Sequence, residues 1–368
     1  MKFTASRDAL LRPLQLVTGV VERRQTLPVL SNLLVVADSD GVSFTGTDLE
    51  VELVARVDSG VSVVQPGQAT IPARKLSDIW RSLPDGADVS VQVEGDRAIV
   101  RSSKSRFALA TLPSADFPRV EKAAGEIDLS LARSEIRRLL DQTAFSMAQQ
   151  DVRYFLNGML VEATPGYIRS VATDGHRLAM CTLSQRQPVE ERIQAIVPRK
   201  GVLELGRLLA DGDDDVSLTL ARNHLRASSG GYTLTSKLVD GRFPDYEKVI
   251  PKASTNVMKA DREALRQAFI RASILSNEKY RGVRMILDEN ELTIQANNPE
   301  QEEAEEVVTV EYSGQRLEIG FNVSYLQDVL GVLSTEQVCL SVSDANSSAL
   351  IEGPGAEDSV YVVMPMRL

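Results

Sequence analysis

The sequence predicts an α+β protein made of three copies of one domain, each with two helices packed on antiparallel sheet. Two independent landmarks predict the repeat. A Thr-Asp pair ends at Asp48 and recurs at Asp174, and Asn298 follows in the matching place, at steps of 126 and 124 residues. A Pro-Arg-Lys landmark begins at Pro198, 126 residues after the similar segment at Pro72. One spacing shared by two landmarks indicates an internal repeat.

The repeat divides the chain into three domains of similar length. The segments 116–118 and 242–244 each carry a Phe-Pro pair, stand 126 residues apart and close the first two copies. We therefore expect domains over residues 1–124, 125–252 and 253–368 of the 368-residue chain. Each is long enough to hold a core of its own.

Each copy begins with apolar residues at helical spacing, which predicts a helix near the start of every domain. These residues are Leu10, Leu11, Leu14, Val17 and Val21; Ile136, Leu139, Leu140, Thr143 and Met147; and Leu265, Ala268, Phe269, Ala272 and Leu275. Asp261 stands where it can cap the third of these helices. Alternating runs at 89–93 and 218–220 predict strands. The run 203–209 predicts a second, shorter helix after its Pro landmark.

Composition excludes several classes of protein. The hydrophobic share of 43% and charged share of 25% are those of a globular chain. No apolar run reaches the ~18–20 residues of a membrane span, and the N-terminal residues lack the layout of a secretory signal. Two distant cysteines, Cys181 and Cys339, cannot build a disulfide framework or a cysteine zinc site. We expect a soluble, cytoplasmic protein without cofactor or metal.

The net charge of −10 argues at first against a nucleic-acid partner. Its distribution changes that interpretation, because residues 1–124 and 125–252 are each neutral and residues 253–368 hold nine basic and 19 acidic residues. Five glutamates fall within 297–306. A solvated face is the simpler explanation of this run, and a docking strip for a basic surface is the alternative.

Basic residues recur in the predicted helices. They include Arg74, Arg199 and Lys200, next to the Pro landmarks, and the pair Arg23-Arg24 after the first helix. A repeat that turns one face in one direction can align such residues into a strip, and a strip of Lys and Arg can follow DNA phosphates without reading bases. We therefore predict that Arg74, Arg199 and Lys200 face DNA.

Several long segments resemble the bacterial DNA polymerase III beta subunit, the sliding clamp, from end to end of the chain. They are 44–50 (FTGTDLE), 151–160 (DVRYFLNGML), 172–179 (ATDGHRLA), 275–282 (LSNEKYRG), 298–306 and 361–368 (YVVMPMRL). The resemblance implies a head-to-tail homodimer, six domains closed around double-stranded DNA, which serves as a non-catalytic processivity factor. The implied partners are the polymerase III catalytic subunit, the clamp-loader complex and other replication and repair proteins, with no membrane.

The resemblance also implies two sets of site residues. It places Arg24, Gln150, Tyr154 and Phe155 at the DNA, although a tyrosine is expected at position 155. It places a pocket for partner peptides between the second and third domains, formed by Leu156, Thr173, Gly175, His176, Arg177, Leu178, Pro244, Lys248, Val249, Asn322, Tyr325, Ser348, Val362, Val363, Met364, Pro365, Met366 and Arg367. Without the resemblance, Val362, Val363 and Met364 would be interpreted as a buried edge strand.

The charge distribution predicts how two subunits join. A head-to-tail contact needs two different, complementary surfaces. We expect Arg101, Lys104, Arg106, Phe107 and Leu109 of the first domain to meet Ile274, Leu275, Glu302, Glu303 and Glu305 of the other subunit's third domain. The alternative is that Phe107 and Leu109 face their own core.

Two other functions compete with the clamp. Asp174, His176 and Cys181 lie close in sequence and could suggest a nucleophile with its base. However, sequence proximity is not active-site geometry, and no phosphate-binding glycine loop is present. The second alternative is a structural DNA-binding protein without partner proteins, for which loss of the C-terminal residues would leave replication intact.

Overall fold

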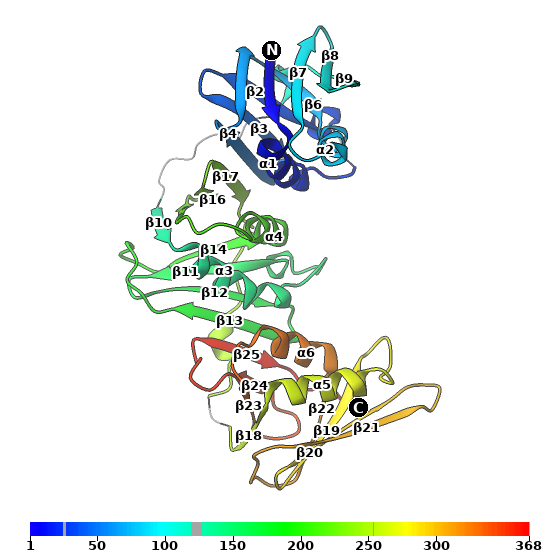
Figure 1. Ribbon diagram of the computed structural model, residues 1–368. Helices are drawn as coiled ribbons and strands as arrows, with labels where there is room; N and C mark the ends of the chain where they lie inside the picture. Colours follow the sequence, from blue (N-terminus) through cyan, green and yellow to red (C-terminus); the bar gives the residue numbers. More distant parts are fainter. Residues whose placement is uncertain (25–26, 119–126, 253, 368) are drawn as a thin grey trace. The chain divides into compact units, whose positions relative to one another are not determined.

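The computed structural model describes residues 1–24, 27–118, 127–252 and 254–367. Its contacts divide the chain into two compact units, the first made of Met1–Arg137 with Lys200–Leu238 and the second of Arg138–Arg199 with Val239–Leu368. The described residues form six α-helices, two in each predicted copy (Figure 1). These are α1 (Arg7–Val20), α2 (Ala73–Ser82), α3 (Arg133–Asp141), α4 (Arg199–Leu208), α5 (Arg262–Ser273) and α6 (Val323–Val332).

The first unit contains two antiparallel sheets. The smaller has the order β5 (Val61–Gln65), β1 (Lys2–Ser6), β7 (Asp88–Glu94), β8 (Arg97–Ser102), β9 (Ser105–Ala110). The larger has the order β10 (Ile127–Leu131), β15 (Val216–Leu220), β16 (His224–Ser229), β17 (Tyr232–Lys237), β4 (Val51–Val57), β3 (Gly41–Thr47), β2 (Asn32–Asp38), β6 (Gly67–Pro72). The strand β9 therefore lies at the edge of its sheet.

The second unit also contains two antiparallel sheets. The larger has the order β14 (Ile193–Pro198), β11 (Gly158–Thr164), β12 (Tyr167–Thr173), β13 (Arg177–Leu183), β25 (Ser359–Val363), β24 (Ala349–Glu352), β23 (Gln337–Val342), β18 (Asn256–Asp261). The smaller has the order β21 (Glu303–Thr309), β20 (Glu291–Asn297), β19 (Gly282–Asp288), β22 (Leu317–Asn322). The acidic segment of the sequence thus supplies an edge strand, β21.

Two strand pairs join consecutive copies of the repeat. Strand β17 of the second copy pairs with β4 of the first, and β25 of the third pairs with β13 of the second. Because each pair makes one continuous sheet, the contacts give two units and not three. The predicted boundary at residue 124 lies outside the described residues, and the boundary at 252 stays a prediction.

The sequence overestimated the length of several helices. Val21 is the C-cap of α1 in extended conformation, and α3 ends at Asp141, so Thr143 and Met147 lie beyond it. Leu275 likewise follows the end of α5. The apolar period continues there because Val21, Thr143 and Met147 are buried although they lie outside the helices. The predicted cap is confirmed, since the Asp261 carboxylate accepts a hydrogen bond from the Ala264 amide at 2.7 Å.

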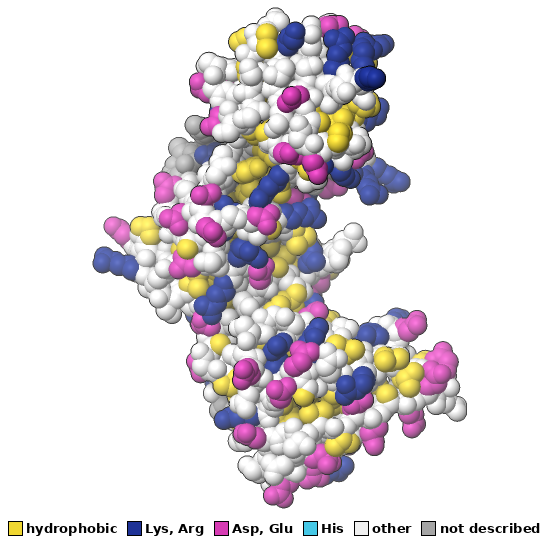
Figure 2. All heavy atoms as spheres, viewed as in Figure 1, with side chains coloured by type: hydrophobic (Ala, Val, Ile, Leu, Met, Phe, Trp, Pro, Cys, Tyr) yellow, Lys and Arg dark blue, Asp and Glu magenta, His cyan; other side chains and the backbone are white. Residues whose placement is uncertain are grey.

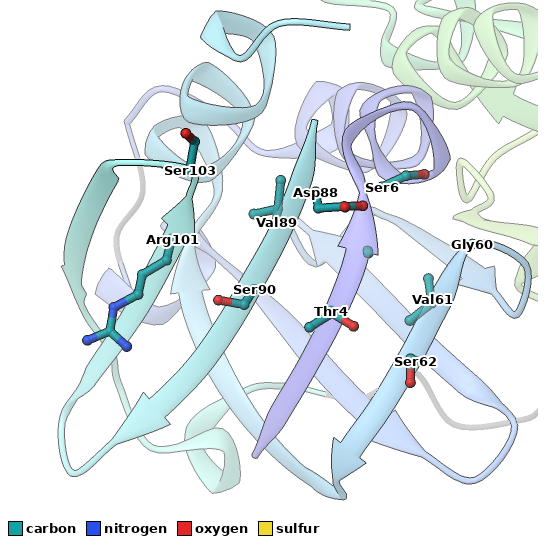
Figure 3. Close-up of a pocket in the computed structure, with 11 residues that line it drawn as sticks. Thr4, Ser6, Gly60, Val61, Ser62, Asp88, Val89, Ser90, Arg101 and Ser103 are labelled. Carbon is teal, nitrogen blue, oxygen red and sulfur yellow. The ribbon is translucent and has the colours of Figure 1, made fainter. Parts of the chain in front are cut away.

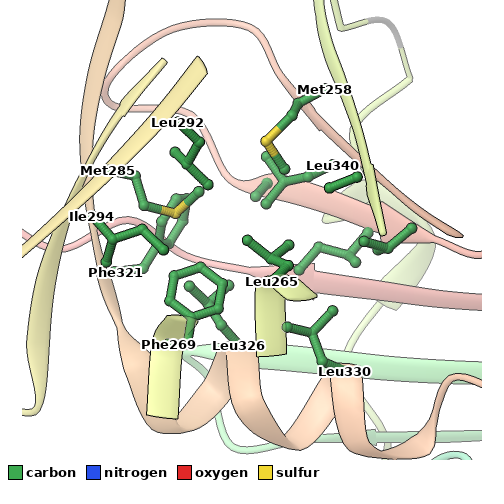
Figure 4. Packing of buried hydrophobic residues seen from close by; sticks show 14 of the residues in the cluster. Met258, Leu265, Phe269, Met285, Leu292, Ile294, Phe321, Leu326, Leu330 and Leu340 are labelled. Carbon is green, nitrogen blue, oxygen red and sulfur yellow. The ribbon is translucent and has the colours of Figure 1, made fainter. Parts of the chain in front are cut away.

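The core of the third copy shows how one helix pair covers the strands (Figure 4). Leu265 and Phe269 of α5 and Leu326 and Leu330 of α6 are buried there, together with Met258, Met285, Leu292, Ile294, Phe321 and Leu340 from the strands. Burial of such side chains contributes ~1.5–3 kcal/mol each. In the part of the chain that is described, no helix has both the length and the apolar content needed to cross a bilayer.

Candidate functional site

Strands β13 and β25 bring the expected peptide-pocket residues of two copies together within the second unit. Leu178 lies opposite Val362 in the ladder, and the Met364 amide donates to the His176 carbonyl at 2.9 Å. The Met366 amide then donates to the Gly320 carbonyl at 2.8 Å. These bonds hold the backbone of the C-terminal tail against β13 and β22. The side chains of the tail take no part in them and remain available to a ligand.

An apolar cluster lies beneath the C-terminal tail and the β13–β25 pair. Leu178 and Val362 are buried in it with Leu160, Val171, Met180, Ile196, Phe243, Tyr246 and Val360. Phe243 and Tyr246 belong to the segment that also carries the exposed residues Pro244, Lys248 and Val249. The two aromatic anchors therefore fix a segment whose outer residues are expected at the pocket.

The loop from Thr173 to Arg177 is held by its own side chains. The Asp174 carboxylate accepts from the His176 and Arg177 amides at 2.9 and 3.0 Å, and the Thr173 hydroxyl donates to the Arg177 carbonyl at 2.6 Å. Gly175 adopts a φ of +89°, a conformation that L side chains rarely take. The loop thus presents the exposed His176 from a fixed backbone.

Arg177 links the second and third copies inside the second unit. Its guanidinium bonds Asp174 at 3.1 Å, the Phe145 carbonyl at 2.7 Å and Asp328 at 2.5 Å. It also stacks on the Tyr325 ring, 4.5 Å from the centroid. Because each of its three guanidinium nitrogens has a partner within the protein, Arg177 is a positioning group.

The tail residues offer adaptable apolar contacts. Met364 is 43% exposed, and Pro365 and Met366 are half-buried. Methionine side chains fit partners of varied shape. Asn322 and Ser348 are half-buried and Arg367 is exposed, and Ser348 directly precedes the pairing of Ala349 with Val363.

Some expected pocket residues are not open to a ligand. Val363 is fully buried in the core of the third copy, and Leu156 is 1% exposed. Val362 is 1% exposed and lies beneath the surface. The interpretation of residues 362–364 as an edge strand is wrong, because β25 lies between β13 and β24. Pairing on both sides leaves Met364, beyond the strand end, as the accessible residue.

In the first unit, the expected DNA contacts differ in their availability. Arg24 is exposed after the end of α1, and Arg74 is exposed in α2 while it donates to the Val21 carbonyl at 3.1 Å. Lys200 is bound to Asp48 and Glu22, both at 2.5 Å. Arg24 and Arg74 can therefore reach an external phosphate more readily than Lys200.

In the second unit, a short loop carries three of the remaining expected DNA contacts, and Arg199 at the start of α4 is the fourth. Gln150 is exposed with a φ of +58°, and Tyr154 is 58% exposed. The Phe155 ring meets the Tyr154 ring edge-on at 5.7 Å between centroids and packs against the apolar cluster under the pocket. Arg199 is half-buried and donates to the Met147 carbonyl at 3.1 Å.

The β8–β9 hairpin carries the expected basic surface. Arg101, Lys104 and Arg106 are exposed there, and Figure 2 shows Lys and Arg side chains gathered over it. Arg101 and Arg106 are cross-strand partners, and like charges directly opposite are unfavourable unless an anion is near. Phe107 is half-buried and Leu109 is buried. Leu109 therefore fits the alternative that it serves its own core.

A groove of about 750 Å³ runs over the face of this sheet (Figure 3). It is lined by Arg101, Asp88 and a row of small polar side chains, among them Thr4, Ser62 and Ser90. The groove lies in the first copy, and none of the expected peptide-pocket residues lines it.

In the second unit, the edge strand β21 carries the expected acidic surface. Glu303 and Glu305 are exposed on the strand and Glu302 precedes it. Ile274, at the end of α5, is 73% exposed, and Leu275 is half-buried. Ile274 is therefore accessible for the expected contact with another subunit.

The sequence patterns did not identify two residues that support the site, Arg153 and Tyr246. Arg153 bonds Asp151 through two nitrogens at 2.8 and 3.0 Å and the Asp174 carbonyl at 3.2 Å, which ties the Tyr154 loop to the Gly175 loop. No spacing in the sequence predicts that Arg153 binds these partners. Tyr246 was missed as an anchor, although the repeated Phe-Pro landmark two residues before it marked this segment.

The grouping of Asp174, His176 and Cys181 does not form a nucleophilic site. Asp174 is engaged by the loop amides and Arg177, and His176 is exposed. Cys181 is fully buried in β13, where burial raises the pKa of its thiol. A thiol kept protonated in apolar surroundings is a packing group.

Comparison with known proteins assigns the family. The DNA polymerase III beta subunit N-terminal, central and C-terminal domain families match residues 1–121, 130–245 and 247–367. Over the full length of both chains, the sequence is 59% identical to the beta sliding clamp of Pseudomonas aeruginosa and 52% to that of Escherichia coli. A crystal structure of the Pseudomonas aeruginosa clamp bound to griselimycin superposes over all of both chains with a TM-score of 0.96. The chain belongs to the DNA polymerase III beta subunit family, the beta sliding clamps.

Proposed function

We propose that two copies of this chain close head to tail around double-stranded DNA through β9 of one subunit and β21 of the other. The observation that supports this joint is the opposite charge at two sheet edges. Arg106 of the edge strand β9, with Arg101 beside it on β8, lies at one edge, and Glu303 and Glu305 of β21 lie at the other. Edge strands present unpaired backbone groups that another strand can satisfy. The contact is heterologous, and two such joints close a ring.

As a member of this family, the chain is a non-catalytic processivity factor that tethers the replicative polymerase to DNA. A ring that slides must not grip the duplex. We propose that Arg24, Arg74, Gln150 and Tyr154 make dispersed contacts to phosphates, with Phe155 adding apolar contact. We propose Arg199 and Lys200 as supports of this surface, because carbonyls and carboxylates already engage them.

The peptide site that we propose consists of the His176 loop, the segment carrying Pro244 and Val249, and the tail from Met364 to Arg367. Its partners are short segments with apolar side chains from the polymerase catalytic subunit, the clamp loader and other replication and repair proteins. Two sites on one ring raise the local concentration of two partners at once. The cytoplasm is the proposed location, and domains over 1–124, 125–252 and 253–368 the proposed organisation.

The length of DNA made in one binding event tests the tethering function. Primer extension on a primed circular single strand, with loader and a polymerase trap, should give long products with the unsubstituted chain. The variant M364A should give short products, because the accessible wall of the peptide site is lost. V257A, which shortens an exposed valine on β18, serves as the control. Long products with M364A would instead favour a structural DNA-binding protein whose tail has no partner.

A further inference from the structure

A buried carboxylate in the second unit has no role in the sites described above. Glu162 of β11 is 0% exposed, and four donors surround it. Its Oε1 accepts from the Tyr167 and Tyr246 hydroxyls at 2.7 and 3.0 Å, and its Oε2 accepts from Arg192 Nε and Gln194 Nε2, each at 2.7 Å. A charge out of water needs such a complete set of partners.

The donors keep Glu162 ionised. Burial alone would raise the pKa of its carboxyl, but the hydrogen bonds from Tyr167, Gln194, Arg192 and Tyr246 lower it below the usual value. Tyr167, Arg192 and Gln194 lie in or next to the strands that flank β11. Tyr246 is different, because it comes from the segment that crosses over the sheet.

Tyr246 is the polar anchor of that segment. It begins a 3-10 turn, Tyr246–Lys248, and Arg169 of β12 donates to its hydroxyl at 3.0 Å. The Arg169 guanidinium also lies over the Tyr246 ring, 5.9 Å from the centroid. Phe243 and the Tyr246 ring bury the segment's apolar side. Hydrophobic burial is non-directional, whereas the hydrogen bond from the Tyr246 hydroxyl to Glu162 has a defined length and direction and so fixes the position of the segment.

We propose that Glu162 is a positioning residue for the peptide site, fixing through Tyr246 the segment that presents Pro244, Lys248 and Val249. The inference rests on the proposed peptide site. The carboxylate does not touch a ligand. It holds one wall of the site at a fixed height above β13 and β25, so that a ligand meets a preformed surface and loses less ordering entropy on binding.

Two tyrosines that donate to the same oxygen make a matched test. Y246F and Y167F each remove one hydroxyl from Glu162 Oε1, but Tyr246 alone carries the pocket segment; Y246F also removes the acceptor of the Arg169 bond. Griselimycin, which the Pseudomonas aeruginosa clamp binds, serves as the probe in calorimetry. We expect Y246F to weaken its binding about tenfold, near the lower end of the effect of one hydrogen bond to a charged group, and Y167F to change it less than about twofold.

Hydrogen exchange gives a second readout that a loss of stability alone would not produce. The backbone amides of residues 244–250 should exchange faster in Y246F than in Y167F, even when the two variants unfold at the same midpoint temperature. Equal griselimycin affinities in the two variants, or equal exchange, would overturn the positioning role while leaving the peptide site intact. Failure of the unsubstituted chain to bind griselimycin would instead overturn the peptide site, and the positioning role with it.

Discussion

Lys200 of the second copy and Asp48 of the first form a salt bridge at 2.5 Å between Nζ and Oδ2. The Lys200 ammonium also donates to the Val20 carbonyl at 2.8 Å. Burial alone would lower the pKa of Lys200, but the hydrogen bonds to Asp48 and Glu22 raise it. Asp174, which corresponds to Asp48 in the repeat, binds Arg177, which reaches Asp328 of the third copy. The aspartate of the Thr-Asp landmark thus contacts the next copy directly at Asp48 and through Arg177 at Asp174.

The first prediction concerns this salt bridge. K200A should lower the free energy of unfolding by about 1–3 kcal/mol, because it leaves the largely buried Asp48 carboxylate without its cation. Urea titration followed by circular dichroism measures the change. K75A, which removes an exposed lysine of α2, is the control and should stay within about 0.5 kcal/mol. Unchanged stability of K200A would show that Lys200 is free to act elsewhere.

The second prediction concerns the subunit joint. The double variant R101E/R106E should be monomeric in native mass spectrometry, because it places four like charges at each joint with Glu303 and Glu305. Combining it with E303R/E305R should restore the dimer. R222E, a charge reversal at an exposed site far along the sequence, should remain dimeric. A dimer that persists in R101E/R106E would rule out the proposed edges.

The third prediction concerns Glu204 of α4, which is buried beside α1. Burial raises the pKa of its carboxyl, so the folded state favours the protonated form. Its contribution to stability is therefore present at low pH and is lost as the pH rises through the raised value. E204Q should be more stable than the unsubstituted chain at pH 8, and the difference should shrink toward pH 4. If E204Q and the unsubstituted chain differed in stability by the same amount at pH 8 and at pH 4, Glu204 would not be titrating between them.

The fourth prediction concerns Gly175. A Cβ there would lie 2.8 Å from Arg153 Nη2, on a backbone with a φ of +89°. G175A should therefore displace the Arg153 bridge and weaken griselimycin binding about tenfold, a ~1.4 kcal/mol effect. G166A is the control, since a Cβ at Gly166 meets no atom within 4 Å. Equal binding by both variants would show that the loop adapts.

The sequence was enough to predict the repeat, the paired helices and the α+β class. The spacing of apolar residues and of caps within one stretch of chain predicts these features, and the cap at Asp261 is an example. It was also enough to predict that the whole charge imbalance lies in the third copy, while the first and second copies are neutral. The resemblance supplied the peptide-site residues, which spacing alone could not bring together.

Other features depend on pairings between distant strands, which no local pattern encodes. The burial of Val363 follows from pairing of β25 with β13 and β24. The engagement of Lys200 follows from contact with residues some 150 to 180 positions earlier. The four partners of Glu162 come from three separate places in the sequence. Such contacts appear only when the sheets are assembled.

The central claim is that the chain encircles its duplex. Comparing how much protein is retained on circular DNA and on linear DNA tests this claim most directly. After loading, the protein should remain on nicked circles through a high-salt wash, because a closed ring cannot leave without opening. It should be lost from the same DNA once a restriction enzyme has cut it, because the ring slides off the ends. Equal loss from circular and linear DNA, or equal retention, would contradict a sliding ring.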